Sequence, residues 1–471
     1  MVFSSLTFVC VFLPLLILIY YLVKGRNNKN IILLTFSLFF YAWGEPVYVL
    51  LMIISIIANY YFALIINKHN EGGNLKKARM YLIISIVFSL SLLIYFKYAV
   101  FFIQSITALL NIEYEAGNLP LPIGISFYTF QILSYVIDVY RKKVAVNKNI
   151  ILLATYLSMF AQLIAGPIVR YISISDELAL REETLAGFYE GLKRFISGFA
   201  KKIIIANNMA IFADAVFNND PSKSGTLIVW TGAIAYSFQI YYDFSGYSDM
   251  AIGLGKMFGF NFPENFNYPY IAKSITDFWR RWHISLSTWF RDYLYIPLGG
   301  NRVKVKKLAR NLLIVWVITG LWHGASWNYV LWGLYYALLL IFEKFLLLKL
   351  FDKIPALLRH IYTISIFVIG WVIFRVESLN NMFVFLRQMF IYNKSNINEF
   401  LFVNDNVMPV MPYFVLAVIF AAPLINKVTY KAAEKSSIAA YASDFSLIII
   451  FLVSIIFLVG STFNPFIYFR F

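Results

Sequence analysis

The amino-acid sequence alternates long apolar segments with short clusters of basic residues. Hydrophobic residues make up 61% of its 471 positions and charged residues only 14%, whereas soluble domains are about 45–50% apolar and about 25% charged. A segment of about 20 apolar residues is long enough to cross the hydrocarbon core of a membrane as a helix. Because the backbone must satisfy its own hydrogen bonds there, the pattern predicts an all-α polytopic membrane protein.

The basic clusters predict how the chain is threaded through the membrane. Lys and Arg number 40 against 24 Asp and Glu, and the short cytoplasmic loops of membrane proteins are enriched in Lys and Arg. The clusters fall at 24–29, 68–79, 141–143, 302–310 and 427–435. If all of them are cytoplasmic, both termini lie outside and the chain makes about ten crossings. The first apolar run, 1–23, is expected to remain as a helix and not to be cleaved as a signal.

Spanning helices are expected where the apolar segments lie. They cover 31–66 as a hairpin interrupted at 44–46, then 81–110, 119–140, 227–243, 314–343, 361–374, 411–424 and 445–460. Region 151–217 departs from this alternation, because its basic residues recur at helical spacing and indicate surface or re-entrant helices. Asp243 and Asp249 lie among small and aromatic residues, where they either line a polar interior or cap a broken helix.

One apolar segment, 314–343, carries a histidine, His323. A titratable side chain in a membrane segment is costly and is usually kept where it faces a cavity or a proton relay. A helix from Arg310 to His323 climbs roughly 20 Å, more than half of a hydrocarbon core of about 30 Å. Gly320 and Gly324 permit a helix break or a close backbone approach by a ligand. His323 is therefore either a functional group or a histidine hydrogen-bonded between helices.

Segment 276–302 combines aromatic and basic residues at helical spacing. The recurring residues are Trp279, Trp282, Leu286, Trp289 and Tyr293, and they share the predicted helix with Arg280, Arg281 and Arg291. Such a helix suits the membrane interface, where aromatic rings lie at headgroup depth and guanidinium groups bind phosphate. The alternative is an amphipathic helix that only anchors the chain.

Other residues limit the kinds of site that the chain can build. Cys10 is the only cysteine, which excludes an intrachain disulfide and a zinc site built on cysteines. The four histidines are His69, His283, His323 and His360. They are too dispersed to predict a metal site. We find no internal repeat and no soluble domain, so the chain is predicted to be one transmembrane domain, 1–471.

Seven motifs that span nearly the whole chain resemble one family. In order they are MVFSSLTFVCVFLPLLILIYYL, SFYTFQILSYVIDVYR, QLIAGPIVRY, YYDFSGYSDMAIG, NFPENFNYPY, DFWRRWHISLSTWFRDYLYIPLGGNR and TGLWHGASWNYVLWG. Together they resemble the membrane-bound O-acyltransferases (MBOAT), and within that family the bacterial branch of alginate O-acetylase membrane subunits.

The resemblance implies a fold and a reaction. The fold is a ring of transmembrane helices around a thin central region, with a funnel from the cytoplasm, in the bacterial cell membrane. The reaction moves an acetyl group from cytoplasmic acetyl-CoA toward an extracellular polysaccharide. The histidine matching His323 is implied to be catalytic and the one matching His283 to be a second functional position. Arg280 and Arg281 are then expected to hold the phosphates of the donor.

A buried histidine suits this chemistry. Desolvation favours neutral imidazole, and neutral imidazole takes the proton of a hydroxyl group as that group attacks a thioester. Donors for the developing oxyanion stay open among Asn328, the indoles of Trp322 and Trp327, and backbone N–H groups freed near Gly324.

The C-terminal residues 466–471 resemble a short motif, F-x-Y-x-x-F, of this branch or of a small companion protein of the D-alanyl transferases. Phe466, Tyr468 and Phe471 occupy its fixed positions. The resemblance implies that Tyr468 carries the acyl group to an outer partner, an extracellular or membrane-anchored esterase-like acyltransferase. The alternative is an aromatic anchor at the membrane interface.

Two other functions are weighed against acetyl transfer. The nearer one is D-alanyl export from a phosphopantetheine carrier protein to teichoic acid. The more distant one is an anion transporter, which is disfavoured because transporters usually show repeated halves with broken helices. Membrane lipid is an expected partner and nucleic acid is not.

Overall fold

The computed structural model describes residues 1–112, 117, 119–392, 405, 408–461, 464 and 467, and these residues form helices, turns and connecting segments without a strand. The predicted all-α class is therefore confirmed. The chain groups into two compact units, Met1–Phe195 with Met250–Pro263, and Ile196–Asp249 with Glu264–Phe471. The chain passes from one unit into the other within α10 (Leu185–Ala200) and within α12 (Thr226–Met257).

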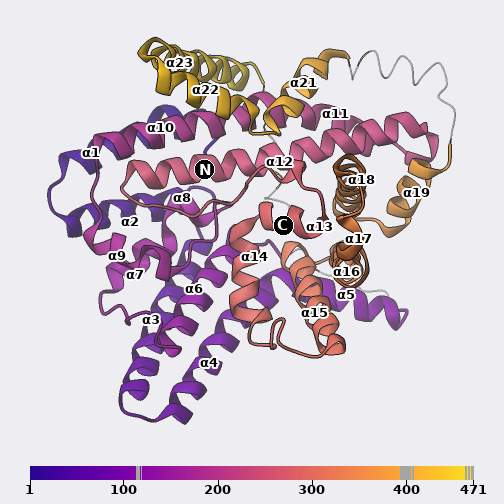
Figure 1. Cartoon of the computed structure of the whole chain (residues 1–471). Helices are drawn as coiled ribbons and strands as arrows, with labels where there is room; N and C mark the ends of the chain where they lie inside the picture. The colour runs from indigo at the N-terminus through magenta and orange to yellow at the C-terminus, as the bar shows by residue number, and fades with distance from the viewer. Residues whose placement is uncertain are drawn as a thin grey trace. The chain divides into compact units, whose positions relative to one another are not determined.

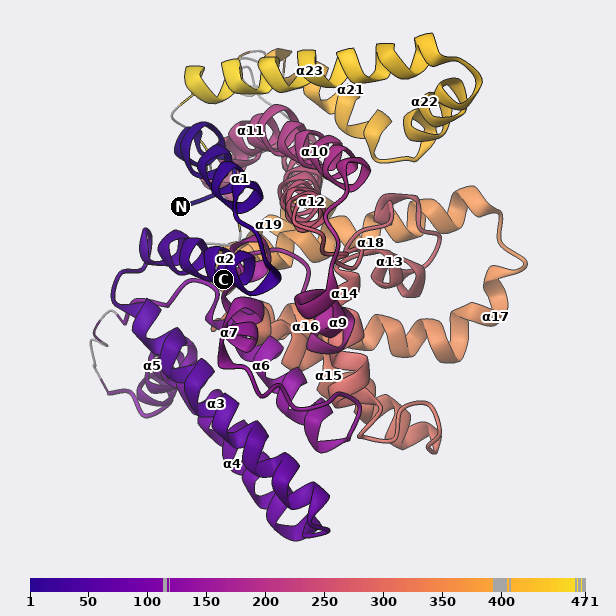
Figure 2. The ribbon, with the colours of Figure 1, turned by 90° about the vertical axis from the view of Figure 1, so that its left-hand side faces the viewer.

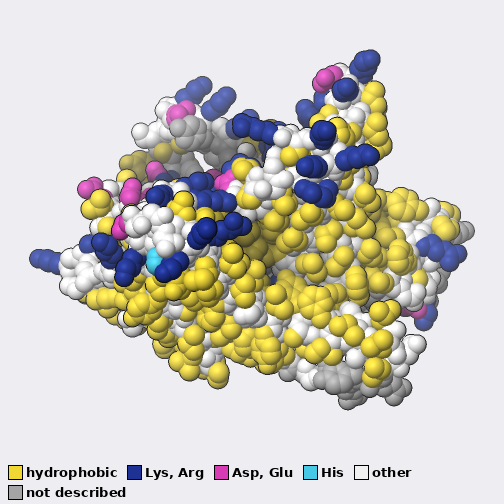
Figure 3. Space-filling view, turned by 90° about the horizontal axis from the view of Figure 1, so that it is seen from below, with side chains coloured by type: hydrophobic (Ala, Val, Ile, Leu, Met, Phe, Trp, Pro, Cys, Tyr) yellow, Lys and Arg dark blue, Asp and Glu magenta, His cyan; other side chains and the backbone are white. Residues whose placement is uncertain are grey.

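Within the described ranges, six helices are long and apolar enough to cross a membrane. They are Tyr48–Glu71, Leu75–Leu109, Leu185–Phe217, Trp327–Phe351, Ala356–Arg375 and Ser437–Gly460. Two shorter apolar helices are Phe8–Leu22 and Met408–Phe420. Figure 3 shows hydrophobic side chains over much of one face, with Lys and Arg gathered in separate groups. These helices confirm a polytopic membrane protein, although they are fewer than the crossings expected from the apolar segments.

The first unit is built from helices of the N-terminal part of the chain. They are η1 (Phe8–Phe12), α1 (Leu13–Leu22), α2 (Arg26–Ala42), α3 (Tyr48–Glu71), α4 (Leu75–Leu93), η2 (Ile94–Tyr98), α5 (Ala99–Leu109), α6 (Ile125–Tyr140), α7 (Ile150–Ser158), α8 (Phe160–Leu163), α9 (Tyr171–Leu180) and most of α10. The expected interruption at 44–46 is confirmed, because α2 ends and α3 begins on either side of it.

Helices α3 and α4 form a long antiparallel hairpin (Figure 2). Asn59 on α3 links the two helices, since its Oδ1 accepts from Ser85 Oγ at 2.7 Å and its Nδ2 donates to Ser89 Oγ at 3.2 Å. At the turn, the Asn74 side chain accepts from the backbone N–H of Lys77 and caps α4. Such polar contacts between apolar helices fix their register where burial alone does not.

The second unit contains the remaining helices. They are η3 (Lys201–Ala206), α11 (Asn207–Phe217), η4 (Pro221–Lys223), most of α12, η5 (Pro269–Ile271), α13 (Ile275–Arg281), α14 (Ile284–Phe290), η6 (Arg291–Tyr295), α15 (Val305–His323), α16 (Trp327–Phe342), η7 (Glu343–Leu347), α17 (Leu348–Phe351), α18 (Ala356–Arg375), α19 (Leu379–Phe390), η8 (Met408–Val410), α21 (Met411–Phe420), α22 (Leu424–Lys435) and α23 (Ser437–Gly460). Helix α15 packs on α16, and α16 packs on α18 (Figure 1).

Glycines allow α15 and α16 to approach each other closely. A Cβ atom on Gly320 would lie 2.1 Å from the carbonyl oxygen of Tyr329, and one on Gly333 would lie 2.3 Å from that of Trp316. Real Cβ atoms do not reach such distances, so both positions need glycine for packing between backbones. At Gly320 the neighbouring helix, and not a ligand, makes the close approach.

The prediction of one continuous helix over 276–302 was wrong. The structure has α13, α14 and η6 instead, with a break at His283, whose backbone is left-handed at φ 45°. The aromatic rings of this segment do not form an exposed anchor either, because Trp279, Trp282 and Trp289 are buried in the second unit. The break lies where His283 and Ser285 contact Asn265, and no Gly or Pro stands beside His283 to predict it.

The expectation of surface or re-entrant helices in 151–217 stays a prediction. Residues Leu185–Phe217 form one continuous helical run. Within it, Lys202 is buried and its Nζ lies 2.6 Å from Asp243 Oδ1. Helix α12 is unbroken, so Asp243 and Asp249 do not cap a helix end. Both carboxylates are buried and paired, and Asp249 Oδ2 lies 2.5 Å from Lys201 Nζ.

Candidate active site

A cavity of about 300 Å³ lies in the second unit between α13, α14, α15 and the end of α16. Its apolar lining residues are Trp279, Leu286, Phe290, Leu312, Val315, Trp316 and Leu340. Its polar lining residues are Thr276, Arg280, His283, Ser287, Arg291, Tyr295, Asn301, Thr319, His323 and Lys344. Such a mixture of aromatic walls and a few polar groups is typical of small-molecule sites.

His323 is the last residue of α15 and is buried. The helix stops at Gly324, which is extended at φ −168°. A Cβ atom on Gly324 would lie 2.1 Å from Cε2 of Tyr329, so the ring of Tyr329 fills the space that a side chain would need. The predicted helix break beside His323 is thus present. The imidazole lies among aromatic rings, with centroids 5.2 Å from both Trp332 and Phe374.

His283 lies between α13 and α14 and is 1% exposed. Its Nδ1 is 3.2 Å from Asn265 Oδ1. The same oxygen accepts from the backbone N–H of Ser285 at 3.2 Å and from Ser285 Oγ at 2.8 Å. A backbone N–H can only donate, so this atom of Asn265 is the carbonyl oxygen and His283 Nδ1 must carry the proton. His283 Nε2 therefore has a free lone pair, and it has no hydrogen-bond partner in the part of the chain that the structure describes.

The charge state of His283 follows from its surroundings. Burial and the neighbouring His323 hold the pKa of His283 well below its usual range. The ring is therefore neutral near pH 7. A neutral imidazole with its Nδ1 proton fixed by Asn265 presents Nε2 as an acceptor of hydrogen bonds or protons.

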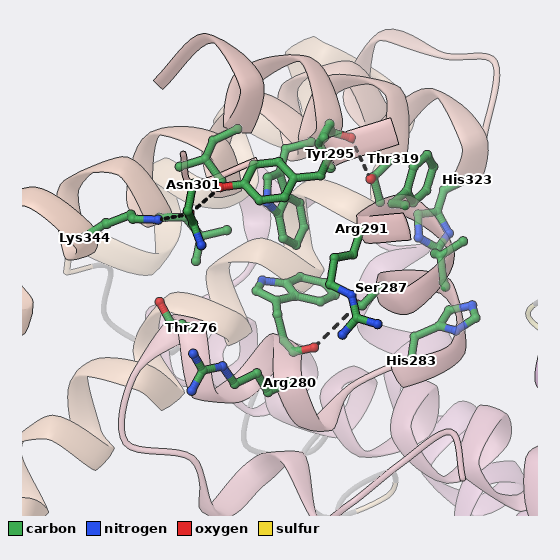
Figure 4. A pocket seen from close by; sticks show the side chains of 17 residues that line it. Thr276, Arg280, His283, Ser287, Arg291, Tyr295, Asn301, Thr319, His323 and Lys344 are labelled. Atoms are coloured by element: carbon green, nitrogen blue, oxygen red, sulfur yellow. Dashed lines mark hydrogen bonds between the residues drawn. The ribbon is translucent and has the colours of Figure 1, made fainter. Parts of the chain in front are cut away.

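The cavity brings the two predicted histidines together. Both line it, and the ring of Trp322 contacts both, with centroids 5.9 Å from His283 and 5.0 Å from His323. Figure 4 shows both imidazoles at one end of the lining and Asn301 and Lys344 at the other. The cavity thus has the two histidines at one end and the cationic side chain of Lys344 at the other.

The two predicted arginines differ in their surroundings. Arg280 lines the cavity, together with the cationic side chains of Arg291 and Lys344. Arg281 is not among the lining residues. Its Nε lies 2.9 Å from Asp277 Oδ1, and its Nη1 donates to the carbonyl oxygen of Asn267 at 3.2 Å.

Glu343 fixes the helix that carries Arg280. Its buried carboxylate accepts from the backbone N–H of Ile275 at 2.6 Å, from that of Thr276 at 2.9 Å and from Thr276 Oγ1 at 2.8 Å. A carboxylate at a helix N-terminus satisfies unpaired N–H groups and complements the helix dipole. The first turn of α13 is therefore tied to the end of α16.

The expected oxyanion donors do not line the cavity. Asn328 donates through Nδ2 to the carbonyl oxygen of Phe374 at 3.0 Å, and neither Trp322 nor Trp327 is a lining residue. Trp279 does line the cavity. Its buried Nε1–H has no hydrogen-bond partner among the residues that the structure describes. A buried indole N–H normally finds a partner.

Sequence reasoning missed Asn265, Trp279 and Glu343 as individual site residues. Each nevertheless lay inside a segment that had been singled out: NFPENFNYPY, the aromatic segment 276–302 and the apolar segment 314–343. A buried Asn in a Pro- and aromatic-rich motif and a Glu at the end of an apolar helix were the available signals. Tyr468 lies outside the described residues.

Comparison with known proteins identifies the family. The model of the membrane-bound O-acyltransferase family matches residues 143–386. The probable alginate O-acetylase of Azotobacter vinelandii is 39% identical and aligns over 100% of both chains. The peptidoglycan O-acetyltransferase of Helicobacter pylori is 34% identical over 100% of this chain and 98% of its own. The teichoic acid D-alanyltransferase of Bacillus subtilis is 32% identical over 47% of this chain and 60% of its own.

These matches define an enzyme class. The chain belongs to the membrane-bound O-acyltransferase family and is an O-acyltransferase. The resemblance found in the sequence motifs is confirmed, and the full-length relatives confirm its branch.

Proposed function

We propose that this enzyme moves an acetyl group from cytoplasmic acetyl-CoA across the membrane toward an extracellular polysaccharide. One observation carries the proposal: two buried histidines and three cationic side chains line a single cavity. The names of the full-length relatives, an alginate O-acetylase and a peptidoglycan O-acetyltransferase, support an acetyl group and a cell-envelope polysaccharide as the acceptor.

His323 is the proposed general base. The acceptor hydroxyl oxygen attacks the thioester carbonyl carbon while its proton passes to the imidazole of His323. The tetrahedral intermediate then expels the CoA thiolate, which takes that proton back from the imidazolium. The products are an ester and the CoA thiol, so His323 ends as it began.

His283 and Trp279 are proposed to orient the reacting groups. Since His283 is neutral and its Nε2 is an acceptor, it suits a hydrogen bond from the acceptor hydroxyl. Trp279 Nε1–H suits the carbonyl oxygen of the thioester, because that oxygen gains negative charge as the hydroxyl attacks. An unpaired donor already facing a protein interior needs little reorganisation to stabilise this charge.

The cationic side chains of the cavity are proposed to hold the phosphates of the donor. Arg280, Arg291 and Lys344 line the cavity, and guanidinium and ammonium groups bind phosphate by charge-assisted hydrogen bonds. Figure 4 shows Lys344 at the end opposite the histidines. An elongated donor with phosphates at one end and a thioester at the other suits a cavity that has Lys344 at one end and the histidines at the other. Arg281 has a lesser role, because it does not line the cavity.

Tyr468 is proposed to receive the acetyl group from the donor and pass it to an outer esterase-like acyltransferase. The positive-inside pattern supports an outer C-terminus. The tyrosine phenol would form a phenyl ester, which transfers its acyl group readily because phenolate is a better leaving group than an alkoxide. A serine of the outer partner would then attack this ester.

The donor class is tested directly. Purified enzyme in vesicles is given acetyl-CoA in one reaction and a D-alanyl phosphopantetheine carrier protein in another, and release of the free thiol is measured. We expect thiol release with acetyl-CoA only. Release with the carrier protein alone would contradict the proposal and favour D-alanyl export, the activity named in the Bacillus subtilis relative.

A further inference from the structure

The chain that follows α23 returns to the interior of the second unit. The backbone N–H of Ile467 donates to Asp243 Oδ2 at 2.8 Å, and Ile467 is buried. Asn464 Oδ1 accepts from Asn207 Nδ2 at 3.3 Å. Helix α23 itself is mostly exposed, and these two contacts tie described residues after Gly460 to the unit.

Asp243 is already half of a buried ion pair. Its Oδ1 lies 2.6 Å from Lys202 Nζ, and the side chains are 2% and 1% exposed. Two charges taken out of water are stable only when their remaining hydrogen-bonding capacity is met. The N–H of Ile467 supplies a charge-assisted bond to the second carboxylate oxygen, which is stronger than a bond between neutral groups. The C-terminal backbone therefore adds to the solvation of the pair.

The elements that hold the pair are held firmly against each other. Asp243 lies within the unbroken α12, and Lys202 lies in η3. Near both, a Cβ atom on Gly246 would lie 2.7 Å from the carbonyl oxygen of Gly198, so the two helix backbones touch. The carboxylate of Asp243 is thus carried by elements whose backbones pack directly against each other.

We propose that Asp243, with its charge balanced by Lys202, is a docking site for the backbone of the C-terminal segment, and that Asn207 is a second anchor through Asn464. The contact is made by a backbone N–H. Docking therefore depends on where the backbone runs and not on which side chain stands at position 467. Tyr468 is the next residue along the chain. Docking thus makes Asp243 a positioning residue for the acyl carrier, and this consequence alone rests on the proposed function.

Hydrogen exchange of the Ile467 amide tests the docking itself. The full-length protein in nanodiscs is labelled in deuterated buffer, and exchange of its C-terminal peptide is followed by mass spectrometry. Asp243→Asn weakens the acceptor, so we expect exchange at Ile467 to become about tenfold faster or more. Asn207→Ala, which leaves the ion pair intact, is expected to accelerate exchange of the same peptide. Asp249→Asn, which breaks the neighbouring pair with Lys201, is the matched control and should leave that peptide unchanged.

The outcomes separate docking from the carrier role. Asp243→Asn protein whose thermal stability matches the wild type and whose C-terminal peptide exchanges at the wild-type rate would overturn the docking site. If Asp243→Asn misfolds, Asn207→Ala and Ile467→Pro, which removes the donor N–H, decide the question by exchange of the remaining amides after Gly460. Tyr468→Phe keeps the docking contacts and should keep slow exchange. Slow exchange with full transfer in that variant would overturn the carrier role and leave docking standing.

Discussion

The Nδ1 atom of His283 lies 3.2 Å from the carbonyl oxygen of the Asn265 side chain, and this contact decides which imidazole nitrogen is available in the cavity. Two donors from Ser285 converge on the same oxygen. One residue from the loop before α13 therefore sets the tautomer of a histidine, caps α14 and stabilises the left-handed backbone between two short helices.

Asn265→Ala is expected to lower the rate of acyl transfer by about tenfold to a hundredfold, as loss of a partner that orients a functional histidine does. It should also lower thermal stability, because a helix cap contributes about 1 kcal/mol. Steady-state kinetics and a melting curve measure the two effects. Asn267→Ala, an exposed position in the same loop, is the control and should change neither. A variant that melts early but turns over normally would show that Asn265 is only structural.

Trp279→Phe is expected to reduce kcat/KM by about tenfold or more, because it removes one hydrogen-bond donor to the thioester and keeps an aromatic ring. Trp230→Phe is the control. Its indole donates to the carbonyl oxygen of Met389 at 2.8 Å, so this variant should lose stability and keep its activity. Equal activity in the Trp279 variant and the wild type would remove the indole from the reaction.

Arg280 and Arg281 are expected to differ although they are adjacent. Arg280→Gln should weaken the binding of acetyl-CoA about tenfold and flatten its dependence on salt, because a charge-assisted contact to phosphate is lost. Arg281→Gln should alter binding much less, because that side chain does not line the cavity. Titration calorimetry at two ionic strengths measures both. If both variants lost the same binding affinity, the positive charge of the helix would attract the donor wherever it lies, and contact with Arg280 in the cavity would not be needed.

Tyr468→Phe keeps the aromatic ring and removes the nucleophile. We expect transfer from labelled acetyl-CoA to the outer acceptor to be lost, while the amount of protein in the membrane is unchanged. Mass spectrometry of the wild-type C-terminal peptide during turnover should find an added acetyl group. Full transfer by the Phe variant would leave direct attack by a partner's hydroxyl as the mechanism.

Sequence patterns predicted the break beside His323 but not the one at His283. At the first, Gly324 marks the position, because a side chain there would meet the ring of Tyr329. At the second, the local sequence continues an aromatic helical pattern without Gly or Pro. The break is set by the tertiary contact of Asn265, which lies 18 positions away in the chain. Local periodicity cannot report a contact of that kind.

The same distinction applies to the site. His283 and His323 could be singled out one at a time, but the packing of α13 to α16 is what brings them to one cavity. Neighbouring residues on a helix point about 100° apart. Which of Arg280 and Arg281 lines the cavity therefore depends on how α13 is held, and Glu343 holds its first turn from the end of α16.

The general base is tested most directly by His323→Ala. Single-turnover release of CoA from acetyl-CoA should fall by about a hundredfold to ten-thousandfold, the usual contribution of a positioned general base. The control is His360→Ala, since His360 is half-buried, lies outside the cavity lining and contacts the carbonyl oxygen of Ala272 at 3.0 Å. We predict that the control keeps the wild-type rate. A folded His323→Ala enzyme that releases CoA as fast as the control would contradict the account.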